Sequence, residues 1–187
     1  MRYFTATIKS APGKDPHSPQ RQQIYLRALR ALPHTTVHLG KFRIDKRVMV
    51  LHPTEFDDTG RPRTVTVKKM EEKGSDVSLA SCLLLDAFTG DSDLYAVLSN
   101  DSDLVTPLRM VRNELGRDTG LLTPVEPKRA SNELKQTLPI LHRAADIATV
   151  KLCQLPDALH DETGVITRPP KWAQNSKGPA EAGPSNQ

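Results

Sequence analysis

The run from Leu94 to Asp103 is the feature that most constrains how this chain can fold. Its first half, Leu94 to Leu98, is a short apolar run typical of a strand that is buried on both faces. Beyond it, apolar residues recur at the spacing of one helix face, at Leu104, Leu108, Val111 and Leu115, and Gly116 follows as a suitable stop. The sequence therefore predicts a buried strand that turns directly into an amphipathic helix.

Two aspartates lie on this predicted turn. Pro107 is compatible with a helix only in the first turn, where backbone N–H groups have no partner within the helix, so the helix should begin near Asp103. Asp101 and Asp103 then follow the carboxyl end of the strand. In open parallel sheets this is the end at which ligands bind, so we expect a functional site there.

The rest of the pattern alternates between strands and helices. We expect strands over 2–8, 36–42, 63–69, 94–98 and 119–122, and helices over 20–32, 74–88, 103–115 and 132–145. This order predicts an α/β fold, a three-layer Rossmann-like domain with a mainly parallel central sheet. We expect the domain to cover residues 1–165, and the proline-rich residues 166–187 to form a disordered tail on which Trp172 could still dock.

Composition narrows the class of protein further. A chain of 187 residues that is 37% hydrophobic can build one real core, and it holds neither an apolar run of membrane-spanning length nor a signal peptide, so we expect a cytoplasmic protein. Cys82 and Cys153 have no metal-site or redox spacing. The net charge of +4 fits a polyanionic partner, but solvated lysines explain it equally well, and 4% aromatic residues argue against a base-stacking platform.

Three carboxylates are expected to converge at one edge of the sheet. Asp76 opens the helix predicted over 74–88, and Asp101 and Asp103 follow the next strand. Clustered carboxylates repel one another unless a cation neutralises them, and hard oxygen ligands favour Mg²⁺ or Mn²⁺. Each acid taken alone has a simpler explanation, a helix cap or an Asx turn, so only the combination predicts a metal site.

Two other motifs include the same residues. A calcium-binding loop that starts at Asp101 would need glycine and glutamate where Thr106 and Arg112 stand, so it is excluded. The run Asp101-x-Asp103-x-Val105 also matches the nucleophile motif of haloacid-dehalogenase-like phosphatases. That motif normally follows the first strand, whereas here it lies past the middle of the chain, so a phosphatase stays a minor alternative.

Several motifs together resemble the NYN domain of the PIN-like nucleases. They are Glu71-Glu72-Lys73-Gly74-Ser75-Asp76-Val77, Ser99-Asn100-Asp101-Ser102-Asp103-Leu104, Gly116 with its short strand, the opening Arg2-Tyr3-Phe4-Thr5-Ala6 and the helix start Ser131-x-Glu133-Leu134. The resemblance covers most of residues 1–172. It implies a PIN-like fold and metal-dependent phosphodiester hydrolysis, typically of RNA, with Asp76, Asp101 and Asp103 as metal ligands and catalytic residues. We expect the RNA partner to be single-stranded. Ser99, Asn100 and Ser102 would shape the substrate pocket, and Lys73 would meet phosphate.

The chain departs from the NYN pattern at its start. The family's first strand, which ends in an aspartate, has no counterpart before Arg2, so the chain would be a truncated copy or a divergent member that works with three acids. Loss of such a strand would expose two backbone edges and weaken metal binding. We therefore expect a magnesium- or manganese-dependent ribonuclease, with a non-catalytic RNA-binding module of the same fold as the alternative. Homo-oligomerisation is compatible with either.

Overall fold

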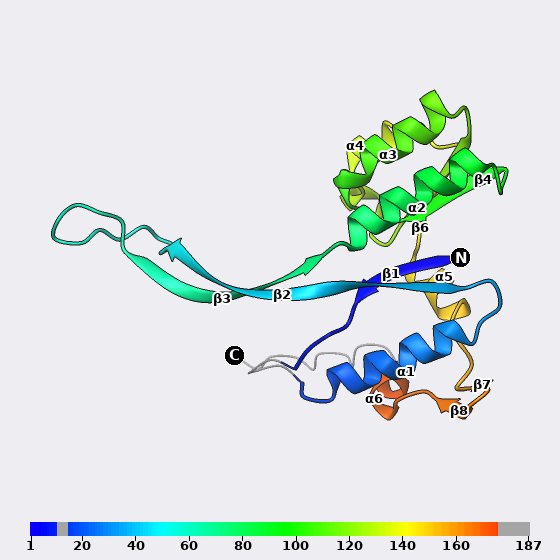
Figure 1. Cartoon of the computed structure of the whole chain (residues 1–187), viewed down its shortest axis with the longest axis horizontal. Helices are drawn as coiled ribbons and strands as arrows, with labels where there is room; N and C mark the ends of the chain where they lie inside the picture. Colours follow the sequence, from blue (N-terminus) through cyan, green and yellow to red (C-terminus); the bar gives the residue numbers. More distant parts are fainter. Residues whose placement is uncertain (11–14, 176–187) are drawn as a thin grey trace, which may run out of the picture.

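A computed structural model describes residues 1–10 and 15–175, which form a mixed α/β protein (Figure 1). Its elements in chain order are β1 (Arg2–Ala6), α1 (Ser18–Arg30), β2 (Thr36–Val50), β3 (Thr64–Lys73), α2 (Ser75–Thr89), β4 (Leu94–Leu98), α3 (Val105–Arg109), β5 (Asp118–Thr123), α4 (Asn132–Lys135), β6 (Leu141–Ala144), α5 (Ile147–Leu152), β7 (Ala158–Asp161), β8 (Gly164–Thr167) and α6 (Pro170–Asn175). A 3-10 turn (Ser102–Leu104) precedes α3, and a π-helical turn (Met110–Glu114) extends it.

The strands form three separate sheets. The first is parallel throughout, in the order β4-β5-β6. The second has the order β1-β2-β3, in which β1 is parallel to β2 and β3 is antiparallel to it, and the third is the antiparallel pair β7-β8. The predicted α/β class and parallel pairing are therefore confirmed. A single three-layer Rossmann-like sheet is not confirmed, because the parallel strands are divided between two sheets.

The main core lies between the β4-β5-β6 sheet and the helices that cover it. Its buried residues come from α2, β4, β5, α4 and the helix that follows β4: Leu83, Ala87, Tyr95, Val97, Leu104, Leu108, Val111, Leu121 and Leu134. Three of the four apolar residues predicted to form one helix face after Asp103 belong to this cluster, and Leu115 packs against it. Gly116 follows with φ +62°, a left-handed conformation that ends the helix as expected.

Helix α2 links the two larger sheets. It packs on β4 through Leu83 and Ala87, and its Asp86 carboxylate accepts two hydrogen bonds of 2.7 Å from the Arg2 guanidinium on β1. In Figure 1 α2 lies along one side of β1 and β2, and α1 lies along the other. The helix places Asp76, in its first turn, beside the end of β4.

Two predictions of local structure were wrong. Strand β4 was expected to be buried on both faces, but only Tyr95 and Val97 are buried, because these alternate residues face α2 and the helix after β4 while Leu94, Ala96 and Leu98 lie on the exposed face. The helix predicted over 132–145 stops after one turn, and β6 takes its place. Leu138 has a positive φ and Pro139 cannot donate a helical hydrogen bond, so the helix ends there.

The proline-rich region is ordered further than expected. Part of the segment predicted to be a disordered tail forms the end of β8 and then α6, which begins at Pro170. Residues 176–187 of the predicted tail lie outside the described residues. Within 1–10 and 15–175, no helix combines the length and hydrophobicity that a bilayer crossing requires.

Candidate functional site

The fold brings the three predicted acids within electrostatic range of one another. Asp76 lies in the first turn of α2, and Asp101 and Asp103 lie in the turn after β4. Partial burial raises the pKa of the Asp76 carboxyl group, and the negative charges of Asp101, Glu72 and Asp103 raise it further. The predicted convergence of these residues is therefore real, and it makes Asp76 harder to ionise.

The individual acids nevertheless have structural roles. The Asp101 carboxylate accepts a hydrogen bond from the backbone N–H of Asp103 at 3.0 Å, and the N–H of Asp101 donates to Ser99 Oγ at 3.1 Å. Asp101 is thus the cap of the 3-10 turn. This is the simpler explanation that the sequence left open for Asp101.

The side chains predicted to bind substrate at this edge are largely engaged elsewhere. Lys73 Nζ lies 2.9 Å from a Glu71 oxygen, so its charge is already paired. The Asn100 amide accepts from the N–H of Ser131 at 2.8 Å and donates to the carbonyl of Arg129 at 3.3 Å, which ties the loop before α4 to the end of β4. Ser102 is exposed on the 3-10 turn.

The predicted magnesium or manganese site is not supported. Among residues 1–10 and 15–175, no three histidine, cysteine, aspartate or glutamate side chains are grouped so that they could hold a metal ion. Electrostatic range is wider than coordination distance, and the Asp101 carboxylate is turned toward the backbone of its own loop. The prediction of Mg²⁺ or Mn²⁺ was wrong, whereas a catalytic role for Asp76, Asp101 and Asp103 stays a prediction.

The raised pKa of Asp76 predicts a pH-dependent gain in stability for Asp76→Asn. The native state holds the Asp76 proton to higher pH than the unfolded chain does, so the stability that this proton contributes is lost as pH rises through the native pKa. Asp76→Asn should therefore raise Tm at pH 7, and the gain should shrink toward pH 4. Thermal unfolding over this range measures it. Asp93→Asn, at an exposed loop acid, is the control, and equal gains in both variants at pH 7 would contradict the assignment.

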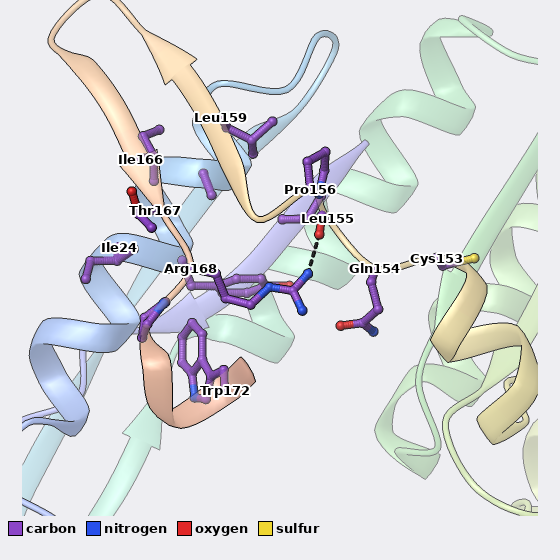
Figure 2. Close-up of a pocket in the computed structure, with 13 residues that line it drawn as sticks. Ile24, Cys153, Gln154, Leu155, Pro156, Leu159, Ile166, Thr167, Arg168 and Trp172 are labelled. Atoms are coloured by element: carbon purple, nitrogen blue, oxygen red, sulfur yellow. Dashed lines mark hydrogen bonds between the residues drawn. The ribbon is translucent and has the colours of Figure 1, made fainter. Parts of the chain in front are cut away.

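A cavity of about 370 Å³ lies on the other side of the molecule, between α1, β8 and α6 (Figure 2). Its walls are mainly apolar and aromatic. The lining residues are Ile24, Tyr25, Ala28, Cys153, Gln154, Leu155, Pro156, Leu159, Ile166, Thr167, Arg168, Pro169 and Trp172. This size and lining are typical of a site for a small organic molecule.

Arg168 is the charged residue in the cavity wall. Its guanidinium donates through Nη2 to the carbonyl of Leu155, and its Nε lies 3.1 Å from the Asp157 carboxylate. The Arg168 side chain is only 19% exposed, whereas that of Asp157 is 86% exposed. Among the described residues Nη1 has no hydrogen-bond partner, so the guanidinium can take a further anionic group.

An aromatic pair forms another wall. The rings of Tyr25 and Trp172 meet edge to face, with centroids 6.1 Å apart and planes at 90°. Tyr25 makes a second edge contact with Tyr3 of β1, at 6.0 Å, so the pair is supported from the sheet side. The cavity therefore offers a rigid aromatic surface beside a cation.

Two ion pairs hold the walls of the cavity together. The Arg27 guanidinium on α1 donates two hydrogen bonds of 2.6 Å to the Asp161 carboxylate at the end of β7, which fixes the β7-β8 hairpin to α1. Lys171 on α6 pairs with Asp15, just before α1. In both cases the pairing lowers the pKa of the aspartate. The cavity is thus built by contacts between segments more than 130 residues apart.

Comparison with known proteins gives one relative and one solved structure. No family model matches the chain. The chain is 28% identical over 178 residues to 6-hydroxy-3-succinoylpyridine 3-monooxygenase HspA of Pseudomonas putida, a match that covers 92% of this chain and 57% of the relative. A protein of unknown function from Vibrio parahaemolyticus is similar in structure, with a TM-score of 0.48 and 16% identity over 76% of this chain and 67% of that one.

These findings overturn the nuclease interpretation. No model of the NYN or PIN-like family matches, and the relative is by name a monooxygenase, so the predicted metal-dependent ribonuclease was wrong. The alternatives, an RNA-binding module and a phosphatase, have no support either. One of the motifs that suggested a nuclease is the acidic turn after β4, and the structure shows that Asp101 in this turn serves to cap a helical turn.

Proposed function

We propose that this chain binds a hydroxylated pyridine with an acidic side chain in the cavity of Arg168 and Trp172, and that it serves the oxygenation of that ring. The observation that carries the proposal is the placement of one partly buried guanidinium in an otherwise apolar and aromatic cavity. The similarity to a monooxygenase named for 6-hydroxy-3-succinoylpyridine supports it, because that compound combines a flat ring with an acid. The chain spans 57% of the length of that relative.

Each wall of the cavity has a defined part in such binding. The ligand's carboxylate would pair with Nη1 of Arg168, in a place where low exposure strengthens a charge-assisted hydrogen bond. The ring would lie against Trp172 and Tyr25. Ile24 and Ile166 would exclude water from the remaining ring edges.

Monooxygenation also needs two electrons, which a redox cofactor such as a flavin supplies when bound. The cavity does not fit a dinucleotide, because about 370 Å³ is near the lower limit for small-molecule sites. The ten glycines of the chain also form no G-x-G-x-x-G turn that could hold a pyrophosphate. We therefore assign ligand binding and positioning to these residues, and no redox step.

An assay under labelled oxygen tests the proposal. The purified chain is mixed with 6-hydroxy-3-succinoylpyridine, NADH, a flavin and ¹⁸O₂, and substrate loss and product mass are followed. With reduced flavin supplied in solution rather than held by the cavity, we expect substrate-dependent oxygen uptake and one ¹⁸O atom in the product, with the other reduced to water. Arg168→Gln should lose this activity, and Arg109→Gln, at an exposed position on α3, should keep it. Uptake that Arg168→Gln does not change would exclude the cavity as the substrate site, and binding without turnover would reject an oxygenation role for the chain alone.

A further inference from the structure

The antiparallel pair of β2 and β3 forms a ribbon that projects from the molecule (Figure 1). The strands pair over ten positions, from Lys41 opposite Lys73 to Val50 opposite Thr64, so at about 3.3 Å per residue the paired part is roughly 30 Å long. Helices α1 and α2 lie beside the base of the ribbon, and residues 46–50 farther out are all exposed. The outer half of the ribbon is therefore open to a partner.

The positive charge of the protein is concentrated on this ribbon. Its ten residue pairs include seven basic and three acidic residues, a net charge of +4. They are Lys41, Arg43, Lys46, Arg47, Lys68, Lys69 and Lys73 against Asp45, Glu71 and Glu72. The whole chain also has a net charge of +4, so the basic and acidic residues outside these pairs balance. The ribbon is thus the part of the molecule that attracts an anionic partner and repels a second copy.

Two lysines in the middle of the ribbon lack an acidic partner. Lys46 lies directly opposite Lys68, and among the described residues no carboxylate pairs with either ammonium group. The carboxylates of Asp45, Glu71 and Glu72 are held by other side chains near them. Like charges directly opposite each other destabilise a strand pair, so an anionic group that contacts both lysines would relieve this repulsion.

The face that carries these two lysines also exposes aliphatic side chains. Opposed residues share a face, and every second residue along a strand lies on it, so Ile44, Val48 and Val50 lie on the same face as Lys46 and Lys68. We call these five residues the lysine face. Ile44, Val48 and Val50 are 51%, 69% and 52% exposed. A phosphate backbone would neutralise the lysines but leave the aliphatic side chains in water, whereas the interface of an anionic bilayer takes up both kinds of side chain.

The turn between β2 and β3 carries three acidic and two basic residues, and its charges are largely engaged within the turn. Glu55 lies 3.5 Å from the Arg63 guanidinium. The Asp57 carboxylate accepts hydrogen bonds from the backbone N–H groups of Thr59 and Arg61, at 2.8 and 3.0 Å. Contact with an anionic surface therefore falls to the paired strands and not to the tip.

We propose that the lysine face docks on the surface of an anionic lipid bilayer, a property separate from ligand binding in the cavity. Lipid phosphates would lie against Lys46 and Lys68, and Val48 and Val50 would enter the boundary between headgroups and acyl chains. The aliphatic stems of the lysines can lie along the valines while their ammonium groups reach the phosphates. Because few side chains are buried, the docking is reversible and weakens as salt screens the charges.

Co-sedimentation with lipid vesicles tests this surface. The full chain is mixed at low salt with vesicles of phosphatidylcholine, with or without phosphatidylglycerol, and the bound fraction is measured. We expect binding only where phosphatidylglycerol is present. Lys46→Gln combined with Lys68→Gln should weaken it about thirtyfold, at about 1 kcal/mol for each basic residue near an anionic surface. Lys128→Gln combined with Lys151→Gln removes the same charge outside the ribbon and should leave binding unchanged.

Val48→Ser separates a bilayer from a soluble polyanion as the partner. It should weaken binding to the anionic vesicles and leave binding to heparin unchanged, because only the bilayer takes up the valine side chain. Circular dichroism and a Tm no lower than that of wild type show that the variants fold. No binding to anionic vesicles, equal losses in the two double-lysine variants, or vesicle binding that Val48→Ser does not change would overturn the proposal. Heparin binding without vesicle binding would assign the ribbon to a soluble polyanion instead.

Discussion

Under the proposed function, Arg168→Gln should weaken binding of 6-hydroxy-3-succinoylpyridine by about ten- to a hundredfold, because a hydrogen bond to a charged group contributes about 1.5–3 kcal/mol. The Arg168 side chain is only 19% exposed. In the variant, water would therefore not fully replace the guanidinium as the partner of the ligand's carboxylate. Glutamine keeps a donor but loses the charge. Isothermal titration calorimetry of wild type and variant measures the difference, and equal affinities would contradict the role of Arg168.

Two further variants separate the charge of Arg168 from its contacts within the fold. Arg168→Lys keeps the positive charge and should recover part of the affinity, although lysine cannot reproduce the fork of the guanidinium. Asp157→Asn removes the exposed carboxylate that now pairs with Arg168 Nε, so a ligand carboxylate would meet less competition and should bind more tightly. A drop in affinity for Asp157→Asn would show that the ion pair serves to hold the cavity in shape.

Leu121→Ala should lower the free energy of unfolding by about 2–5 kcal/mol. Leu121 is fully buried in β5, the middle strand of the parallel sheet, where it belongs to the cluster formed with α2 and the helix after β4. The truncation leaves a cavity that the surrounding strands and helices cannot close. Urea unfolding measures the change, as a lower midpoint at an unchanged slope.

Leu98→Ala is the control for this measurement. Leu98 ends β4 and is 61% exposed, so its truncation should cost less than about 1 kcal/mol. Similar losses in the two variants would show that β4 is covered in solution, either within the molecule or by a partner.

The parts of the fold that could be predicted from the sequence are those with strong local signals. Helices α1 and α2 and the strand β5 lie within a few residues of their predicted ranges. The spacing of apolar residues and the glycine or proline that ends an element are both visible in the local sequence. Which strands pair with each other was harder to predict from the sequence. No local signal shows that β1 and β4 belong to different sheets, and among the described residues this division leaves one edge of β4 without a partner strand.

The two candidate sites also differ in how far they could be predicted from the sequence. The acids at 76, 101 and 103 could be predicted to converge, since each lies at the end of a recognisable element. The cavity could not, because its walls come from α1 and from residues 153–172, and half of the latter lie in a proline-rich stretch that resembles a tail. Trp172, the single tryptophan of the chain, and Arg168, four residues before it, were the available signals.

That single tryptophan also gives the most direct test of the proposed ligand site. Trp172 fluorescence, corrected for ligand absorbance, is followed during titration with 6-hydroxy-3-succinoylpyridine and, separately, with its methyl ester, which lacks the charge that Arg168 would bind. The proposed site predicts a saturable change with the acid and a much weaker one with the ester. No saturable change with the acid, or the same response to acid and ester, would contradict it.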